Sequence, residues 1–389
     1  MLVIGKFWGL GVLGEVGFII SCSVFISVVS RMGGDYSSYY HVIGNEIREK
    51  NVVKRYVTCG LILAITTSLM LCFSFWYVMR LTGVNERMTL DLNSLFLCST
   101  IITVLQFTSS VKRALSKIVE SYFYEQGIFF LLVSVVIFSF HFFLVDNHNI
   151  ELLMLTMASI GGGMSVCALI SIRHWFSFKF ITLECIHGYV KISAGFLFFS
   201  LFEYYLFWAP GVISGWFLSF ESVGVIALGM RFFQLILFGL SLLNVFLAPR
   251  LLNEIKLRDV GADMSVSVSL ILDPYKEDYR IYFYSSILVF VTGMIFCSIY
   301  INNNSHFFVV LCFGVVGVIR CWYGPLIHVF NQLKIKGDLF FMSLSGVSFV
   351  LMCIFNAIFK RPEGMLVVYI LSWVMTLQYM NYKVFKRLF

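Results

Sequence analysis

The chain alternates between long apolar stretches and shorter polar ones. Eleven apolar runs approach the length of about 20 residues that a helix needs to cross the hydrocarbon core of a bilayer. The runs are continuous, whereas the strands of a membrane β-barrel alternate apolar and polar residues over about 10 positions. We therefore predict an all-α integral membrane protein with transmembrane helices at residues 7–30, 56–79, 92–111, 126–145, 150–172, 192–217, 222–248, 281–300, 307–329, 338–359 and 364–382.

The basic residues of the polar stretches predict how these helices are oriented. Segments on the side that follows the first run hold 21 Lys and Arg residues, and segments on the opposite side hold 5. An excess of Lys and Arg marks the cytoplasmic side of a membrane protein. The split predicts a multi-pass membrane protein with its amino terminus outside and its carboxyl terminus in the cytoplasm.

The composition excludes several other classes of protein. Of the 389 residues, 59% are hydrophobic and 13% are charged, whereas soluble domains carry about 25% charged residues and disordered chains are rich in charge. Nine of the ten cysteines lie in apolar runs, which is typical of small buried hydrophobic side chains rather than of a disulfide framework. The net charge of +7 reflects the cytoplasmic segments, so we expect no nucleic-acid partner.

The spacing of the polar segments suggests two similar halves. The two longest cytoplasmic segments, 31–55 and 249–280, follow the first and seventh runs. They occupy equivalent positions if the chain is a twelve-helix protein that lacks its first helix. Repeated halves are the usual construction of secondary transporters. We predict an amino-terminal lobe at residues 1–180 with five transmembrane helices and a carboxyl-terminal lobe at 181–389 with six.

The motifs of several enzyme classes are absent from the sequence. There is no G-x-x-x-x-G-K-[ST] phosphate loop, no H-E-x-x-H and no G-x-S-x-G. The outside loops are short, and the longest, at residues 81–91, has eleven residues. Membrane enzymes that act on lipid-linked sugars usually present a large extramembrane loop or domain. We therefore expect no enzyme, no metal and no cofactor.

Three ionisable residues lie deep inside predicted helices, where charge is expensive and usually functional. Glu203, Arg231 and Arg320 each lie roughly 14–20 Å from a membrane face at 1.5 Å per residue. The functional interpretation is a polar central cavity for an anionic, phosphate-bearing substrate, because Arg suits bidentate phosphate contacts. Gln106 could line the same cavity. In the structural interpretation Glu203 and Arg231 form a buried ion pair that holds the bundle together.

Two intramembrane prolines could act as hinges. Proline removes a backbone hydrogen bond from a helix, and transporters use such breaks at binding sites. Pro210 lies in the sixth run, and Gly324 and Pro325 follow Arg320 in the ninth. A static kink is an equal alternative for these positions.

Several tracts resemble a known family. Residues 196–203 (FLFFSLFE), 220–225 (FESVGV), 229–234 (GMRFFQ) and 247–250 (LAPR) resemble the seventh and eighth helices of polysaccharide exporters. These exporters include the flippases for O-antigen and related lipid-linked oligosaccharides in the multidrug/oligosaccharidyl-lipid/polysaccharide exporter superfamily. Residues 30–69 look like the junction of that family's second and third helices, and residues 323–337 look like its tenth helix and following turn.

The resemblance implies a twelve-helix, two-lobe fold with a cationic central cavity that works by alternating access. It also implies an undecaprenyl-diphosphate-linked oligosaccharide as substrate, flipped to the outer leaflet for O-antigen, lipopolysaccharide or other surface polysaccharide biosynthesis. The expected partners are this lipid-linked substrate, membrane lipid, a polysaccharide polymerase and a chain-length regulator. Arg231 and Arg320 match the family's cavity positions approximately.

Two other functions stay open. A drug or cation antiporter of the same superfamily typically needs a carboxylate in the amino lobe. The amino half has no acid at the midplane, since Glu15 lies near the outer end of its helix, and a cationic cavity has the wrong charge for cationic drugs. A membrane-embedded polymerase acting on lipid-linked sugars would need catalytic groups in a large external loop, which the sequence lacks.

Overall fold

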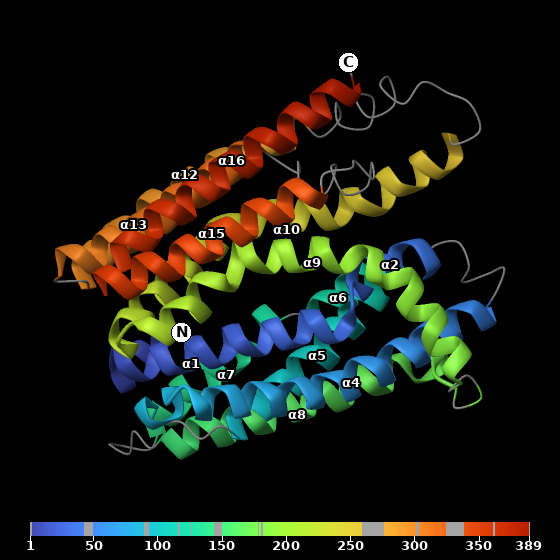
Figure 1. Cartoon of the computed structure of the whole chain (residues 1–389), viewed down its shortest axis with the longest axis horizontal. Coiled ribbons are helices and arrows are strands. Elements are labelled where there is room, and N and C mark those ends of the chain that lie inside the picture. The colour runs from blue at the N-terminus through green and yellow to red at the C-terminus, as the bar shows by residue number, and fades with distance from the viewer. Residues whose placement is uncertain are drawn as a thin grey trace. The chain divides into compact units, whose positions relative to one another are not determined.

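The computed structural model describes most of the chain and shows an all-helical protein (Figure 1). The described residues are 2–42, 50–88, 93–115, 117–124, 126–143, 150–177, 179, 182–258, 276–300, 303–323, 338–360 and 362–388. A helix satisfies its backbone hydrogen bonds within one segment, as a bilayer requires, which is why the long apolar runs fold as helices.

Each of the eleven predicted transmembrane runs coincides with a helix in the described residues, which confirms the predicted fold class. These helices are α1 (Leu2–Arg31), α4 (Lys50–Leu81), α5 (Asn93–Ala114), α7 (Gln126–Phe143), α8 (Ile150–Ile172), α9 (Leu183–Phe217), α10 (Phe220–Arg258), α12 (Lys276–Tyr300), α13 (Asn304–Trp322), α15 (Asp338–Phe359) and α16 (Pro362–Leu388). Within these described residues, eight helices carry a stretch that is long and apolar enough to cross a membrane.

Four shorter elements lie in segments that we expected to be irregular. They are α2 (Gly34–Val42), α6 (Ile118–Phe123) and the 3-10 turns η1 (Val84–Arg87) and η2 (Arg173–Trp175). The helix α2 is polar, with the sequence GDYSSYYHV, so no apolar run in the sequence predicts it. It contributes Asp35, Tyr36 and Ser37 to the site described below.

Backbone contacts divide the chain into two units, Met1–Ala227 and Leu228–Phe389. The division falls inside α10, whereas the predicted lobes meet between residues 180 and 181. The difference arises from α9, which packs against α1, α2 and α4 and so belongs to the first unit. The chain continues from α9 through a two-residue turn into α10, whose first residues also belong to that unit.

The first unit is built around α1, which packs against α4, α5 and α9. Glycines let the helices approach closely along the amino-terminal half of α1. A side chain at Gly14 would overlap the backbone of Phe220, and one at Gly224 would overlap the carbonyl of Leu10. The start of α10 therefore lies directly against α1 at a contact that only small residues allow.

The second unit has an aromatic core contributed by α10, α13 and α16. Trp373 is fully buried, and its ring lies 5.6 Å from that of Phe233 and 6.5 Å from that of Tyr369. Tyr369 in turn contacts Phe313 at 5.2 Å. The side chain of Phe313 occupies the space above Gly229, so α10 and α13 are held close together.

Candidate functional site

The site begins with a tight turn between α1 and α2. The helix α1 ends at Arg31, and the next two residues, Met32 and Gly33, have φ angles of 50° and 80°. Gly33 also lies against the backbone of α9, because a side chain there would come within 2.6 Å of the Ser193 carbonyl oxygen and the Leu197 nitrogen. Glycine is the residue that fits both the left-handed conformation and the close approach. We refer to residues 31–37 as the α1–α2 corner.

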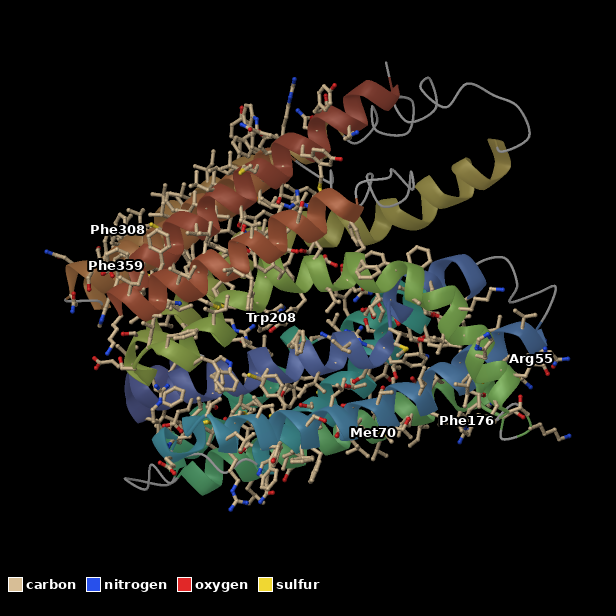
Figure 2. The ribbon with its side chains drawn as sticks, viewed as in Figure 1. Arg55, Met70, Phe176, Trp208, Phe308 and Phe359 are labelled. Carbon is tan, nitrogen blue, oxygen red and sulfur yellow. The ribbon has the colours of Figure 1, made fainter. Side chains whose placement is uncertain are left out.

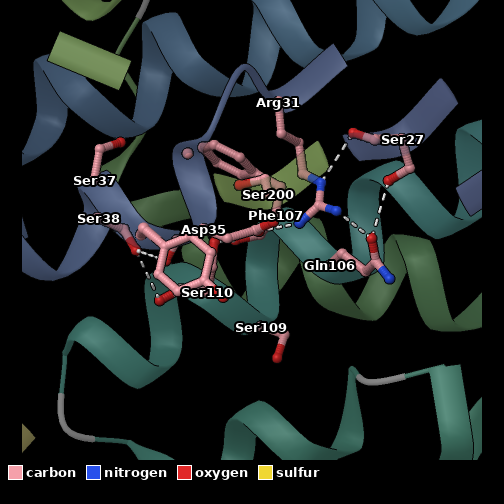
Figure 3. Close-up of polar contacts among 12 residues, drawn as sticks. Ser27, Arg31, Asp35, Ser37, Ser38, Gln106, Phe107, Ser109, Ser110 and Ser200 are labelled. Carbon is pink, nitrogen blue, oxygen red and sulfur yellow. Dashed lines mark hydrogen bonds and ion pairs between the residues drawn. The ribbon is translucent and has the colours of Figure 1, made fainter. Parts of the chain in front are cut away.

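The guanidinium of Arg31 is the buried charge of this corner. The residue is 3% exposed, and its Nε donates to the Ser27 carbonyl oxygen at 3.1 Å. One Nη forms an ion pair with Asp35, and the other donates to Oε1 of Gln106 (Figure 3). The Ser27 hydroxyl donates to the same Gln106 oxygen at 3.1 Å. Because an uncompensated buried cation is very costly, these partners are what allow Arg31 to stay inside the protein.

Glu203 projects from α9 toward α2. Its carboxylate accepts a hydrogen bond from the hydroxyl of Tyr36. The Tyr36 ring packs edge-on against Phe199, with centroids 5.0 Å apart. Glu203, Tyr36 and Phe199 are each half-buried, so this acid and its aromatic neighbours border the more accessible side of the corner.

A buried hydroxyl network fixes the inner side of the corner. The hydroxyl of Ser37 lies 2.6 Å from that of Tyr56 on α4 and 2.8 Å from that of Ser193 on α9. Tyr56 donates to the Gly34 carbonyl oxygen at 3.0 Å, and Tyr189 donates to the Arg31 carbonyl oxygen at 3.0 Å. Burial raises the pKa of the Tyr189 hydroxyl, so that group remains a neutral donor.

The two arginines predicted from the sequence lie in the second unit. Arg231 is half-buried on α10 and donates from Nη1 to Oε1 of Gln234 at 2.7 Å. Arg320 is 3% exposed and lies in the last turn of α13. A cation is favoured there by the negative end of the helix dipole. The thiol of the next residue, Cys321, lies 3.7 Å from the Ile236 carbonyl oxygen and could donate to it, which ties this turn to α10.

Of the three residues predicted as hinges, the structure describes only Pro210. Pro210 is buried within α9, which continues on both sides of it, and its carbonyl accepts a hydrogen bond of 2.6 Å from Ser214. Gly324 and Pro325 lie outside the described residues. The ninth predicted run extends to residue 329, whereas α13 ends at Trp322.

The structure thus brings Gln106 and Glu203 to the α1–α2 corner within the first unit, and it places Arg231 and Arg320 in the second. Sequence reasoning missed Arg31 and Asp35 because a charge directly after an apolar run reads as the start of a loop. Their spacing of four residues was the available signal, since such pairs meet when a helix continues.

Comparison with known proteins identifies the fold. No family model matches the sequence, and no curated protein matches it. A solved structure described as the inward-facing conformation of a multidrug resistance MATE family transporter of the MOP superfamily matches with a TM-score of 0.54 and 12% sequence identity. The match covers 99% of this chain and 94% of that one. The chain therefore has the fold of a MATE transporter along nearly its whole length.

Proposed function

We propose that this protein is a transporter that flips an undecaprenyl-diphosphate-linked oligosaccharide across the bacterial inner membrane by alternating access. The flipped repeat unit would supply O-antigen or another surface polysaccharide. The observation that carries the proposal is the pairing of a transporter fold with buried or half-buried arginines on helices that can span a membrane. A diphosphate is the part of such a substrate that guanidinium groups bind best.

In this proposal Arg231 and Arg320 bind the diphosphate. Gln106 and Glu203 supply hydrogen-bonding groups for the sugar, and the prenyl chain stays in lipid. The Gln234 amide supports the Arg231 assignment, because its oxygen accepts a hydrogen bond from Nη1 of Arg231 at 2.7 Å and so orients the guanidinium.

A multidrug antiporter is the second candidate, and two observations favour it. The matching solved structure is described as a multidrug resistance transporter, and the first unit contains a buried carboxylate at Glu15, which is 4% exposed. A buried acid can carry a proton or a sodium ion during transport. Dye efflux from vesicles under an imposed sodium or pH gradient separates the candidates, because robust efflux favours the antiporter.

The experiment for the proposal uses a strain whose surface polysaccharide depends on this protein. Arg231→Gln with Arg320→Gln should abolish export and leave lipid-linked repeat units on the inner leaflet. The matched control is Arg80→Gln, which removes an exposed guanidinium that lies over Trp76 at the far end of α4. Normal export by the double variant would refute the assigned roles. Repeat units that accumulate on the outer leaflet in a deletion strain would instead indicate a polymerase.

A further inference from the structure

Three membrane-span ends of the first unit meet at one end of that unit. They are the start of α4, the end of α8 with its following turn η2, and the start of α9. The backbone nitrogen of Ser177 donates to Thr58 on α4 at 3.0 Å. The rings of Tyr56 on α4 and Tyr189 on α9 lie 5.0 Å apart, and both residues belong to one hydrophobic cluster.

This shared end carries a concentration of positive charge. Lys50, Arg55, Arg173 and Lys191 are exposed, and Lys54 is half-buried. Along the described residues of these three segments, Glu184 is the one acidic side chain. We call the surface formed by the five basic residues the basic shelf. Figure 2 shows Arg55 of the shelf and Phe176 of the turn after α8 at the same end of the unit.

The folding of each segment explains why the charges point outward. On α9 the face that carries Cys185 and Tyr189 packs against α4, which leaves Lys191 on the opposite, exposed face. On α4 the residues Val53, Tyr56 and Val57 are buried in the same cluster. The neighbouring residues Lys54 and Arg55 are therefore left outside the cluster, where their charges can form part of the shelf.

Two residues of the shelf lie at the ends of apolar spans, where lipid headgroups would meet the protein. Lys191 precedes by two residues the span that starts at Ser193, and Arg173 lies in the last turn of the span Leu155–Trp175. At 1.5 Å per residue, these charges are within about 5 Å of the ends of the apolar stretches. The half-buried rings of Trp175 and Phe176 lie beside them, and aromatic rings favour the membrane interface.

We infer that the basic shelf binds the headgroups of anionic phospholipids, such as phosphatidylglycerol, in the leaflet that it faces. Along the described parts of these three segments, five basic side chains outnumber one acidic side chain, and an anionic headgroup would neutralise the resulting positive potential. Each Lys or Arg near an anionic surface contributes about a fivefold increase in affinity. This surface is separate from the proposed substrate residues, so the inference does not depend on the cargo.

The test measures which lipids the full-length protein retains in detergent. The protein is mixed with equal amounts of phosphatidylglycerol and phosphatidylcholine, and bound lipid is counted by native mass spectrometry. We expect the wild type to retain phosphatidylglycerol preferentially, with the preference weakening as salt is added. Arg55→Gln should lower the preference about fivefold, and the triple variant Lys54→Gln, Arg55→Gln, Lys191→Gln should lower it at least about tenfold.

Arg80→Gln is the matched control, because Arg80 is an exposed arginine at the opposite end of the same helix. It should change the preference by less than about twofold, since it removes one isolated charge. Equal retention of both lipids by the wild type would overturn the inference, as would an unchanged preference in the triple variant. A phosphatidylglycerol preference that Arg231→Gln with Arg320→Gln removes, and that the triple variant leaves intact, would overturn it in favour of binding at the proposed substrate residues.

Discussion

Substitution of Gly33 by alanine perturbs the α1–α2 corner at the point where it rests on α9. Gly33 has a φ of 80°, and the added methyl group would lie 2.6 Å from three backbone atoms of α9. Backbone atoms cannot rotate away as a flexible side chain can, so the corner and α9 must separate. The Arg31 network depends on the same turn, and its partners on α5 would shift relative to the guanidinium.

Two contributions add up to the loss of folding free energy that we expect for Gly33→Ala. A left-handed conformation costs an alanine about 1–2 kcal/mol, and overpacking of a tight contact costs about 1–3 kcal/mol more. Gly83→Ala is a matched control, because Gly83 has a φ of 70° and nothing lies within 4 Å of its added methyl group. It carries the conformational strain alone, so the difference between the two variants measures the contact with α9.

The assay is thermal unfolding of each purified variant in the same detergent. For a chain of this length the unfolding entropy is about 0.8 kcal/mol/K. Gly83→Ala should therefore lower the Tm by about 1–2 °C and Gly33→Ala by about 2–6 °C. Equal shifts for the two variants would refute the close contact between the corner and α9. A larger shift for Gly83→Ala would show that the strain estimate itself is wrong.

Three further substitutions test other parts of the structure. Asp35→Asn should lower stability by about 2–4 kcal/mol because it leaves the buried Arg31 cation without its counter-charge. The double variant Arg31→Met, Asp35→Asn should regain at least half of the lost stability in thermal unfolding. Additive losses from the two substitutions would contradict the pairing of Arg31 with Asp35. Arg87→Gln should cost about 1 kcal/mol, since its guanidinium donates to two carbonyl oxygens at the end of α9; a Tm equal to that of the wild type would exclude this cap. The hydrogen bond from Lys112 lowers the pKa of Glu120, so its stabilisation is complete above about pH 4.5 and is lost as the pH falls through the lowered value. An acid titration of Glu120→Gln should therefore lose less stability than the wild type below pH 4.5, and parallel curves would contradict the assignment.

The long helices were predictable because each is specified locally by about 20 consecutive apolar residues. The segment that folds as α15 was predicted at residues 338–359 and is found at those bounds. Helix ends were harder to place. The apolar run that contains Arg320 continues past Trp322 in the sequence, but α13 ends there.

The candidate site was only partly predictable, because its decisive contacts join residues far apart in the chain. Gln106 and Glu203 were identified as polar residues in apolar helices, which is a local signal. Their partners Arg31 and Tyr36 come from the polar segment after the first run, and the sequence gives no local sign that this segment folds as α2 and packs against α9. The left-handed conformation of Gly33 lets the chain turn there, and a lone glycine does not reveal it.

Transport of the proposed substrate is tested most directly by reconstitution. Purified protein is placed in liposomes that carry an undecaprenyl-diphosphate-linked oligosaccharide, and the fraction of sugar accessible to an external glycosidase is followed over time. Wild-type protein should make the inner-leaflet pool accessible, and the double variant Arg231→Gln, Arg320→Gln should leave it protected as in protein-free liposomes. The account would be contradicted if the inner-leaflet sugar stayed inaccessible in liposomes with folded wild-type protein. It would also be contradicted if the double variant made that sugar as accessible as the wild type does.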